Sequence, residues 1–339
     1  MGRDAGAVLD PTVLKIDCPA VVAALTERIR HIVARILRRR GVVVAVSGGV
    51  DSAVCASLAV RALGVERVLA LLMPERDTPS EATDRGKILC ERLGIRYEVE
   101  NISSILEAAG CYRRRDEAVR RLFPEFGPDY RLKIAIAGDL LEGDRLNYFN
   151  LIIQSPDGKQ KRERMPVDVY LGVVAATNMK QRVRKLLEYY HAECRNYAVM
   201  GTPNRLEYEL GFFVRGGDGL ADLKPIAHLY KTQVYALAEW LDVPECIRRQ
   251  VPSTDTYSLP QTQQEFYFAL PYDVMDLALY AYLHNIPAES AAPVLGLSAE
   301  QVRRIYRDIA GKRRLAKQLD RPAILVNDTA ESLDSGPCS

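Results

Sequence analysis

Five consecutive apolar residues at positions 42–46, four of them valine, constrain the fold of this chain more than any other feature. An uninterrupted short apolar run is typical of a strand that is buried on both faces of a parallel sheet. Further strand patterns alternate with helical patterns along the chain. We expect strands at 42–46, 68–73, 95–99 and 197–200, and helices at 51–63, 80–93 and 172–191. This alternation predicts an α/β fold, an open parallel sheet with helices on both faces.

The turn after the first predicted strand has the composition of a phosphate-binding loop. It consists of Ser47, Gly48, Gly49, Val50, Asp51 and Ser52. Glycines let the backbone approach an anion closely, and the free N–H groups at the start of the following helix point toward that anion. The two serine hydroxyls add donors. Because Asp51 repels a bare phosphate, we expect a magnesium ion between its carboxylate and the phosphate oxygens.

This loop differs from the two most familiar nucleotide-binding patterns. It lacks the lysine of the GxxxxGK[ST] loop and the spacing of the GxGxxG dinucleotide turn. A Ser-Gly-Gly-x-Asp-Ser turn after a strand instead resembles the PP-loop of the ATP pyrophosphatases, a superfamily that includes asparagine, GMP, argininosuccinate and NAD synthetases. The resemblance implies the adenine nucleotide α-hydrolase-like fold and cleavage of ATP between its α- and β-phosphates.

Three segments in the second half of the chain are similar to the ammonia-dependent NAD synthetases in order and in spacing. The first is Asn-Met-Lys-Gln-Arg at 178–182. The second, at 201–222, begins with Gly-Thr-Pro-Asn-Arg-Leu-Glu and ends with Gly-Asp-Gly-Leu-Ala-Asp. The third combines Leu-Tyr-Lys-Thr-Gln at 229–233 with Pro-Ser-Thr-Asp at 252–255. Together these segments are far more specific than the loop alone.

The resemblance implies roles for individual residues. Asp51 and Glu207 would hold the magnesium ion, and Lys231 would stabilise the charge of the departing pyrophosphate. These three residues are the predicted catalytic residues. Thr202 and Ser253 would join the phosphate loop and Lys231 in binding ATP, although the family usually has threonine at the position of Ser253.

The deamidated dinucleotide, deamido-NAD, would contact Arg182, Arg215 and Asp222. An arginine can hold a pyrophosphate group with two parallel hydrogen bonds. Arg215 replaces the lysine that is usual in the family, which keeps the charge but changes the geometry. Other interpretations stay open for several residues. Glu207 and Arg182 can be solvated side chains of helices, and Ser253 can be an ordinary turn serine after Pro252. Asp222 can cap a turn, and Thr202 can cap a helix before Pro203.

The implied reaction is the ATP-dependent amidation of deamido-NAD to NAD. The substrate carboxylate attacks ATP, pyrophosphate leaves, and ammonia then displaces AMP from the acyl-adenylate. The residues before position 42 are too few for a glutaminase domain, so we expect ammonia itself as the nitrogen donor. The chain would be a carbon–nitrogen ligase, and a homodimer by family resemblance. Two alternatives stay open: an amide ligase that adenylates a different carboxylate, and a non-catalytic nucleotide-binding protein.

The chain is predicted to have three regions. Residues 1–285 form the NAD synthetase-like domain, and the resemblance covers roughly 20–110 and 170–285 of it. A helical extension follows at 286–327, and the polar tail at 328–339 is predicted to be disordered.

An excursion at 111–170 interrupts the α/β pattern. It begins with a highly charged stretch at 113–121, which predicts a solvated helix. Strand patterns at 148–153 and 161–167 flank Pro-Asp-Gly at 156–158, which predicts a hairpin. We expect the excursion to lie over a site or an interface.

Composition limits the remaining possibilities. The 339 residues include 46 basic and 44 acidic side chains, so the small net charge gives no reason to expect a nucleic-acid partner. No apolar run approaches the roughly 20 residues that a membrane-spanning helix needs. The seven cysteines form no Cys-x-x-Cys pair, which argues against disulfides and structural zinc and favours a reducing, cytoplasmic location.

Overall fold

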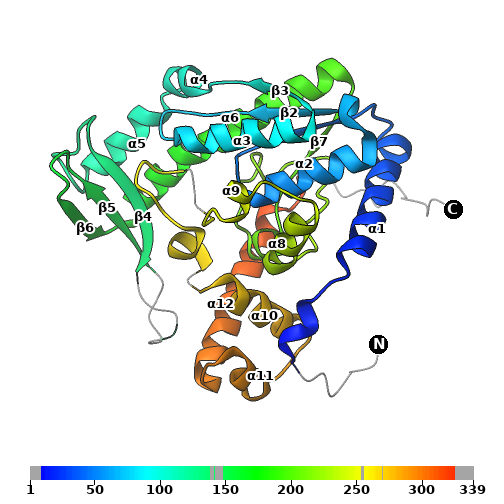
Figure 1. Cartoon of the computed structure of the whole chain (residues 1–339). Helices are drawn as coiled ribbons and strands as arrows, with labels where there is room; N and C mark the ends of the chain where they lie inside the picture. Colours follow the sequence, from blue (N-terminus) through cyan, green and yellow to red (C-terminus); the bar gives the residue numbers. More distant parts are fainter. Residues whose placement is uncertain (1–8, 138–140, 142–147, 253–255, 269, 325–339) are drawn as a thin grey trace.

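A computed structural model of the chain describes residues 9–137, 141, 148–252, 256–268 and 270–324 (Figure 1). Its centre is a four-stranded parallel sheet with the strand order β3-β2-β1-β7. The strands are β1 (Val42–Ala45), β2 (Val68–Leu72), β3 (Arg96–Val99) and β7 (Ala198–Met200). Each lies within one residue of its predicted bounds. Of the helices in the described ranges, none is long and apolar enough to cross a membrane.

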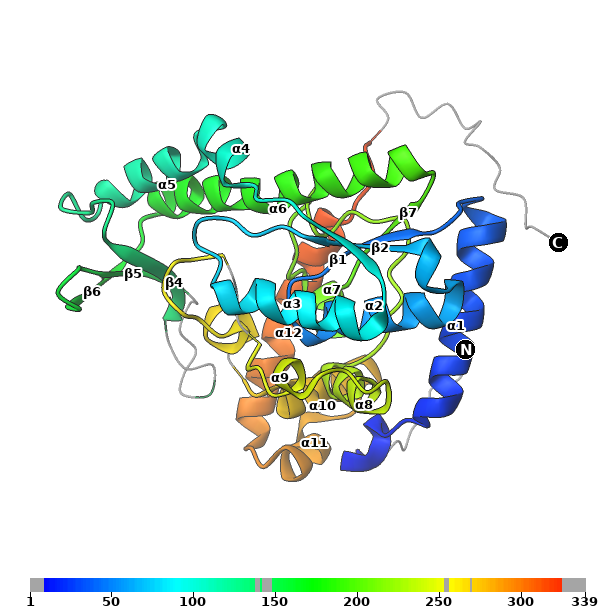
Figure 2. The ribbon, with the colours of Figure 1, turned by 45° about the horizontal axis from the view of Figure 1, so that its top comes forward.

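The alternating side chains of β1 explain why helices cover both faces of this sheet. Val42 and Val44 pack in one apolar cluster with α1, α2, α3 and α8, whereas Val43 packs in another with α4, α5 and α6. Figure 2 shows α6 on one side of the sheet and α2 and α3 on the other. The bounds are α1 (Cys18–His31), α2 (Val50–Leu63), α3 (Ser80–Leu93), α4 (Ser103–Ala108), α5 (Cys111–Arg120), α6 (Val167–Arg195) and α8 (Lys231–Trp240). The predicted fold class is confirmed.

The excursion contains a second, antiparallel sheet with an apolar cluster of its own. The predicted hairpin is confirmed, and Gly158 in its turn has a φ of +84°. A further strand, β4, was not predicted. The strands are β4 (Arg131–Ala137), β5 (Tyr148–Gln154) and β6 (Gln160–Arg164). All five residues of β6, the edge strand, are exposed.

The charged stretch at 113–121 was predicted to be a solvated helix, but helix α5, which contains most of it, is partly buried. Arg115 is buried, with 5% of its side chain exposed, and its Nη1 donates to Asp77 at 2.7 Å. Charged residues can therefore face the interior when a carboxylate from another element pairs with them. The prediction of a solvated helix is wrong at this position.

Most of the chain after residue 204 is helical, and the helices at 205–210, 272–283, 288–295 and 299–319 pack in a separate apolar cluster below the sheet (Figure 1). Gly296, at a φ of +67°, ends α11 and allows the turn into α12. The elements are α7 (Arg205–Leu210), α9 (Glu245–Arg248), a short π-helix (Gln264–Phe268), α10 (Tyr272–Leu283), α11 (Ala288–Leu295) and α12 (Ala299–Leu319). Helices α11 and α12 lie within 286–327, where helical structure was predicted. The predicted tail at 328–339 lies outside the described residues.

Candidate active site

The phosphate loop connects the end of β1 to the start of α2. Gly48 has a φ of +81°, and a Cβ atom there would lie 2.3 Å from the carbonyl oxygen of Ala82. Only glycine fits this position. Gly49 is the N-cap of α2, and among the described residues no side chain caps it. The first N–H groups of α2 are therefore placed to bind an anion.

The two serines of the loop hold its shape. The Ser47 N–H donates to Ser52 Oγ at 3.3 Å, and Ser52 Oγ donates to the carbonyl of Gly49 at 3.0 Å. The Gly49 N–H in turn donates to Ser47 Oγ at 3.3 Å. These bonds hold the two hydroxyls together, with their oxygens 3.3 Å apart.

The three predicted catalytic residues come together beside this loop, although they lie far apart in the sequence. Lys231, at the start of α8, is 1% exposed and forms an ion pair with Asp51. Asn204 links Asp51 to Glu207: its Nδ2 donates to Asp51 Oδ1 at 3.0 Å, and its Oδ1 accepts from the Glu207 N–H at 3.2 Å. The structure thus groups two carboxylates and one ammonium at a single point.

No role was predicted for Asn204, although it belongs to the segment at 201–222 that is similar to the NAD synthetases. Its backbone N–H also donates to Glu207 Oε2 at 3.1 Å, which completes a capping box at the start of α7. The signal that was available is the Asn-x-x-Glu pattern at 204–207, since this spacing fixes the glutamate against the helix start. The helix cap is therefore Asn204, so the alternative role for Thr202 as the cap of this helix is wrong.

The electrostatics of the group favour a bound cation. Burial and the nearby charge of Asp51 raise the pKa of Glu207 to about 8. Burial alone would lower the pKa of Lys231, but the charges of Asp51 and Glu207 outweigh burial and raise it. Two carboxylates therefore compete for one ammonium group. Carboxylate oxygens are the ligands that Mg²⁺ prefers, so the residues fit a magnesium ion.

Two further residues, neither of them predicted, act on Glu207: Gln263 bonds to it directly, and Tyr272 bonds to Gln263. Gln263 Nε2 donates to Glu207 Oε1 at 3.3 Å, and the hydroxyl of Tyr272 donates to Gln263 Oε1 at 2.6 Å. Burial, together with the charges of Glu207 and Asp51, raises the pKa of Tyr272, so its hydroxyl keeps the proton that it donates. The amide of Gln263 is therefore held with its nitrogen toward Glu207.

Lys231 is positioned by the helix that follows it and by a residue of α10. Asp276 accepts hydrogen bonds from the backbone N–H groups of Lys231, at 3.2 Å, and Thr232, at 2.7 Å. Burial raises the pKa of Asp276 to about 6, although these two bonds favour its charged form. This carboxylate compensates the lysine at a helix start, where a cation is otherwise unfavourable.

The other predicted ATP-binding residues follow the same edge of the sheet. β1 and β7 pair in parallel with Val44 opposite Met200, so Thr202 follows β7 at the edge where Ser47 follows β1. Ligands of open α/β sheets bind at this carboxyl edge. Ser253 lies outside the described residues.

Two of the three residues predicted to bind deamido-NAD lie together. Arg182, on α6, donates from Nε to the carbonyl oxygen of Arg215 at 3.2 Å. Arg215 donates from Nη2 to the carbonyl oxygen of Arg321 at 3.0 Å, so the segment that follows α12 supports this loop. Both guanidinium groups are exposed to solvent.

Asp222, the third residue, is bonded to the sheet. Its Oδ2 accepts from the N–H of Val199 in β7 at 2.7 Å, and its Oδ1 accepts from the hydroxyl of Tyr189 at 3.3 Å. Asp222 therefore fixes its loop to the end of β7. These two partners lie 23 and 33 positions away in the chain, so the bonds are not a turn cap, and contact with deamido-NAD stays a prediction.

A second group of potential metal ligands lies away from this site. Within the part of the chain that the structure describes, Glu98, Glu100 and His191 are the one set of three such residues close enough to share an ion. Arg195 already occupies the set, because its Nη2 lies 2.5 Å from Glu98 Oε1 and its Nη1 lies 3.3 Å from His191 Nδ1. A guanidinium in this place competes with a metal ion.

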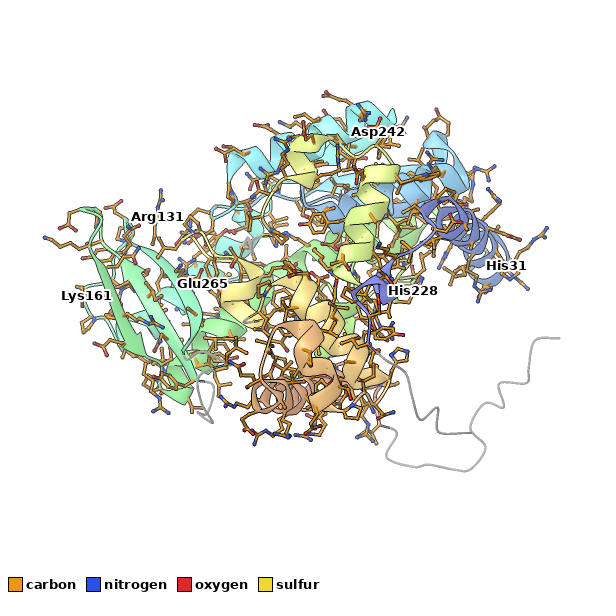
Figure 3. The ribbon with its side chains drawn as sticks, turned by 60° about the horizontal axis from the view of Figure 1, so that its bottom comes forward. His31, Arg131, Lys161, His228, Asp242 and Glu265 are labelled. Atoms are coloured by element: carbon orange, nitrogen blue, oxygen red, sulfur yellow. The ribbon has the colours of Figure 1, made fainter. Side chains whose placement is uncertain are left out.

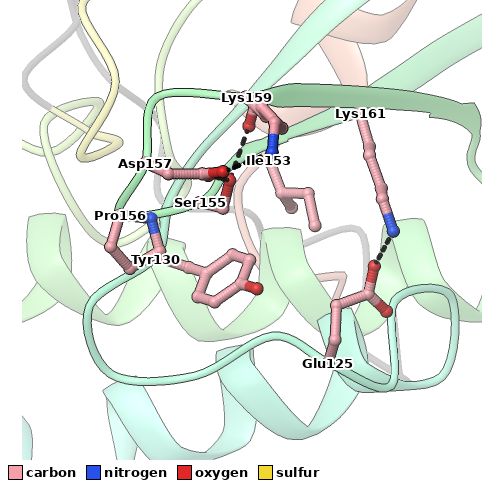
Figure 4. A pocket seen from close by; sticks show the side chains of 8 residues that line it. All are labelled: Glu125, Tyr130, Ile153, Ser155, Pro156, Asp157, Lys159 and Lys161. Carbon is pink, nitrogen blue, oxygen red and sulfur yellow. Dashed lines mark hydrogen bonds and ion pairs between the residues drawn. The ribbon is translucent and has the colours of Figure 1, made fainter.

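A cavity of about 400 Å³ lies at the tip of the excursion sheet (Figure 4). Its lining includes Tyr130 and Ile153, and its charged groups pair with one another: Lys161 with Glu125, and Lys159 with Asp157. None of the predicted site residues lines this cavity. It is separate from the candidate active site.

The fold and the site define the class of this protein: an open α/β protein with a nucleotide phosphate loop and a carboxylate pair at the carboxyl edge of its parallel sheet. Comparison with known proteins narrows the class. The family model for NAD synthase matches residues 21–121 and 154–316. The chain therefore belongs to the NAD synthase family.

Relatives agree with this assignment over nearly the whole chain. The NH(3)-dependent NAD(+) synthetase of Rhizobium meliloti (strain 1021) is 51% identical over 96% of this chain and 96% of its own length. The protein with the same description in Rhizobium rhizogenes (strain K84) is 50% identical over 94% of this chain and 96% of its own.

Solved structures share the fold. The NMN synthetase of Francisella tularensis has a TM-score of 0.60 at 22% identity and covers 92% of this chain, with all of its own chain matched. The NH3-dependent NAD synthetase of Campylobacter jejuni has a TM-score of 0.59 at 22% identity and covers 91% of this chain and all of its own.

Proposed function

We propose that this chain catalyses the ATP-dependent amidation of deamido-NAD to NAD, with ammonia as the nitrogen donor. The observation that carries this proposal is the ion pair of Asp51 with Lys231 beside the phosphate loop, with Glu207 linked to Asp51 through Asn204, in a chain that belongs to the NAD synthase family. The relatives that are about half identical are described as NH(3)-dependent NAD(+) synthetases.

Each group has a defined part in this proposal. The N–H groups at the start of α2 and the amine of Lys231 bind the phosphates, and Asp51 and Glu207 hold Mg²⁺. Magnesium bound there would withdraw charge from the phosphate oxygens and make pyrophosphate a better leaving group. Thr202 and Ser253 complete the ATP site. The deamido-NAD site would consist of Arg182, Arg215 and Asp222.

The reaction would need no covalent enzyme intermediate. A carboxylate oxygen of deamido-NAD forms a bond to the α-phosphorus of ATP, and the bond from that phosphorus to pyrophosphate breaks. The nitrogen lone pair of ammonia then attacks the acyl carbon. AMP leaves with the electrons of the carbon–oxygen bond, and the nitrogen loses a proton to give the amide. The residues contribute by positioning and by charge stabilisation.

We also propose that the active form is a homodimer. Helix α6 exposes large apolar side chains along its outer side, with 59% of Leu171, 62% of Leu186 and 57% of Tyr190 accessible. Arg182 lies one turn before Leu186 on the same side of the helix. A second copy that covers these side chains would bring Arg182 to the subunit interface.

The experiment is a direct assay. The purified protein is incubated with ATP, magnesium, ammonium and deamido-NAD, and AMP, pyrophosphate and NAD are quantified by chromatography. We expect the three products in equal amounts. If AMP is released only with another carboxylic acid, that acid and not deamido-NAD is the substrate. Absence of AMP with every acid tested would contradict the proposal.

A further inference from the structure

The chain has a feature that the proposed reaction does not explain: residues 256–265, here called the bridging segment, run from the excursion sheet to the active site. The segment lies along the free edge of β4. The N–H of Leu132 donates to Ser258 Oγ at 2.9 Å, and the N–H of Leu259 donates to the carbonyl of Leu132 at 3.0 Å. Further along, Gln261 Nε2 donates to the carbonyl of Ile134. These bonds attach the segment to the sheet edge.

Side chains of the excursion sheet strengthen this attachment. Lys133 Nζ lies 2.6 Å from Glu265 Oε1, and it also donates to the carbonyl of Pro260 at 3.4 Å. Leu259 packs in a small buried apolar cluster with Ala135 of β4 and Ile152 of β5. Figure 3 labels Glu265 where the bridging segment meets the excursion sheet. Polar and apolar contacts thus hold the segment in one place.

The start of the bridging segment is held by a buried lysine. Lys180 is 1% exposed, and its Nζ donates to the carbonyl of Thr256 at 2.9 Å. The same amine donates to Glu75 and to Asp77, each at 2.8 Å, and Asp77 also accepts from Arg115. Buried ion pairs therefore fix the lysine that holds Thr256.

The end of the bridging segment reaches the candidate magnesium ligand. Gln263 donates to Glu207 Oε1, while the other oxygen, Oε2, accepts from the N–H of Asn204. The two donors approach the carboxylate from α7 and from the bridging segment. Because both oxygens are bonded, the carboxylate plane has little freedom to rotate.

We propose that Gln263 is a positioning residue for Glu207, and that the excursion sheet is the support that holds Gln263 in place. The proposal rests on the proposed function, because the orientation of Glu207 matters there as that of a metal ligand. The family model leaves residues 122–153, which include β4, unmatched. The strand of the support that contacts the bridging segment, β4, therefore lies outside the residues that the family model matches.

The test of Gln263 measures metal binding apart from turnover. Mn²⁺ is titrated into the protein with ATP present, and the free ion is followed by its electron paramagnetic resonance signal. In Gln263→Ala we expect Mn²⁺ affinity to fall about tenfold, in the range for partners that orient metal ligands. Tyr272→Phe should shift the affinity less and in the same direction. Gln160→Ala, on the exposed strand β6, is the matched control and should bind as the wild type does.

The test of the support uses two lysines of the excursion sheet. Lys133→Ala removes the contact with Glu265, whereas Lys161→Ala removes an ion pair with Glu125 that does not touch the bridging segment. We expect Lys133→Ala, but not Lys161→Ala, to weaken Mn²⁺ binding, with both variants folded by circular dichroism.

Unchanged Mn²⁺ affinity in Gln263→Ala would overturn the role of Gln263. Weaker binding in Gln263→Ala with unchanged binding in Lys133→Ala would overturn the role of the sheet. If the wild-type protein forms no NAD, the proposed function fails, but the Mn²⁺ titrations still decide whether Gln263 acts on Glu207.

Discussion

At the scale of single residues, the site depends on holding two carboxylates close together beside one lysine. Asn204 bonds to both acidic residues, and Lys231 pairs with Asp51. In this arrangement the charged form of Glu207 is unfavourable, because burial and the charge of Asp51 raise its pKa to about 8. A bound cation would stabilise the charged form of Glu207, since it attracts both carboxylates.

The raised pKa of Glu207 predicts how stability depends on pH without ligands. The folded protein binds a proton at Glu207 that the unfolded chain releases near pH 4. This contribution to stability is complete below about pH 4 and is lost as pH rises to about 8. The side chain of the Glu207→Gln variant does not titrate, so the variant does not lose this stability. Its melting temperature relative to that of the wild type should therefore increase as pH rises from about 5 to 8.5. A constant difference in calorimetry would contradict the assignment.

Removal of the Asp51 carboxylate tests the site most directly. In Asp51→Ala we expect AMP release to fall roughly a hundredfold or more, because the phosphates lose the charge stabilisation organised by this residue. The control is Asp84→Ala, whose side chain is exposed on α3. Near-normal AMP release by Asp51→Ala would show that the reaction does not need the Asp51 carboxylate.

The sequence predicted those parts of the site that lie in short motifs. The phosphate loop, Glu207 and Lys231 were found because each belongs to a segment with recognisable spacing. Gln263 and Tyr272 were missed because Gln263 reaches Glu207 across 56 positions of the chain, and no spacing rule relates them. Such contacts depend on how the bridging segment packs, which periodicity does not describe.

At the scale of elements, the start of α8 depends on a side chain from α10. Asp276→Ala would leave the N–H groups of Lys231 and Thr232 without their acceptor. We expect a loss of about 1 to 2 kcal/mol in the free energy of unfolding, as for other helix-start acceptors, and a raised KM for ATP because Lys231 is displaced. Denaturant titration and steady-state kinetics measure the two effects. An unchanged KM would show that Lys231 does not depend on Asp276.

Buried strands were easier to predict than the excursion. The valine-rich run of β1 has no other reasonable interpretation, whereas β4 alternates between buried residues such as Leu132 and partly exposed ones such as Lys133. The same alternation is visible in the sequence at 131–134. The start of α6 was also predicted too late, because Val167, assigned to a strand, is exposed in the first turn of the helix.

At the scale of the whole molecule, the exposed side of α6 predicts association of two copies. Leu186→Asp places a charge among apolar side chains that the dimer would bury, so we expect the variant to sediment as a monomer at micromolar concentration. Leu315→Asp, at an exposed leucine of α12, is the matched control and should remain dimeric. A wild-type monomer, or a dimer unaffected by Leu186→Asp, would contradict this interface.

The excursion sheet also bears on how the protein behaves in a crowded solution. A small sheet has two open edges, and open edges recruit strands from neighbouring molecules into aggregates. Here the bridging segment covers the edge of β4, and the edge of β6 carries Lys161, Arg162 and Arg164 with every residue exposed. Like charges on two approaching copies repel, and hydrated side chains are costly to strip of water. Both edges of the excursion sheet therefore have features that oppose pairing with strands of other copies.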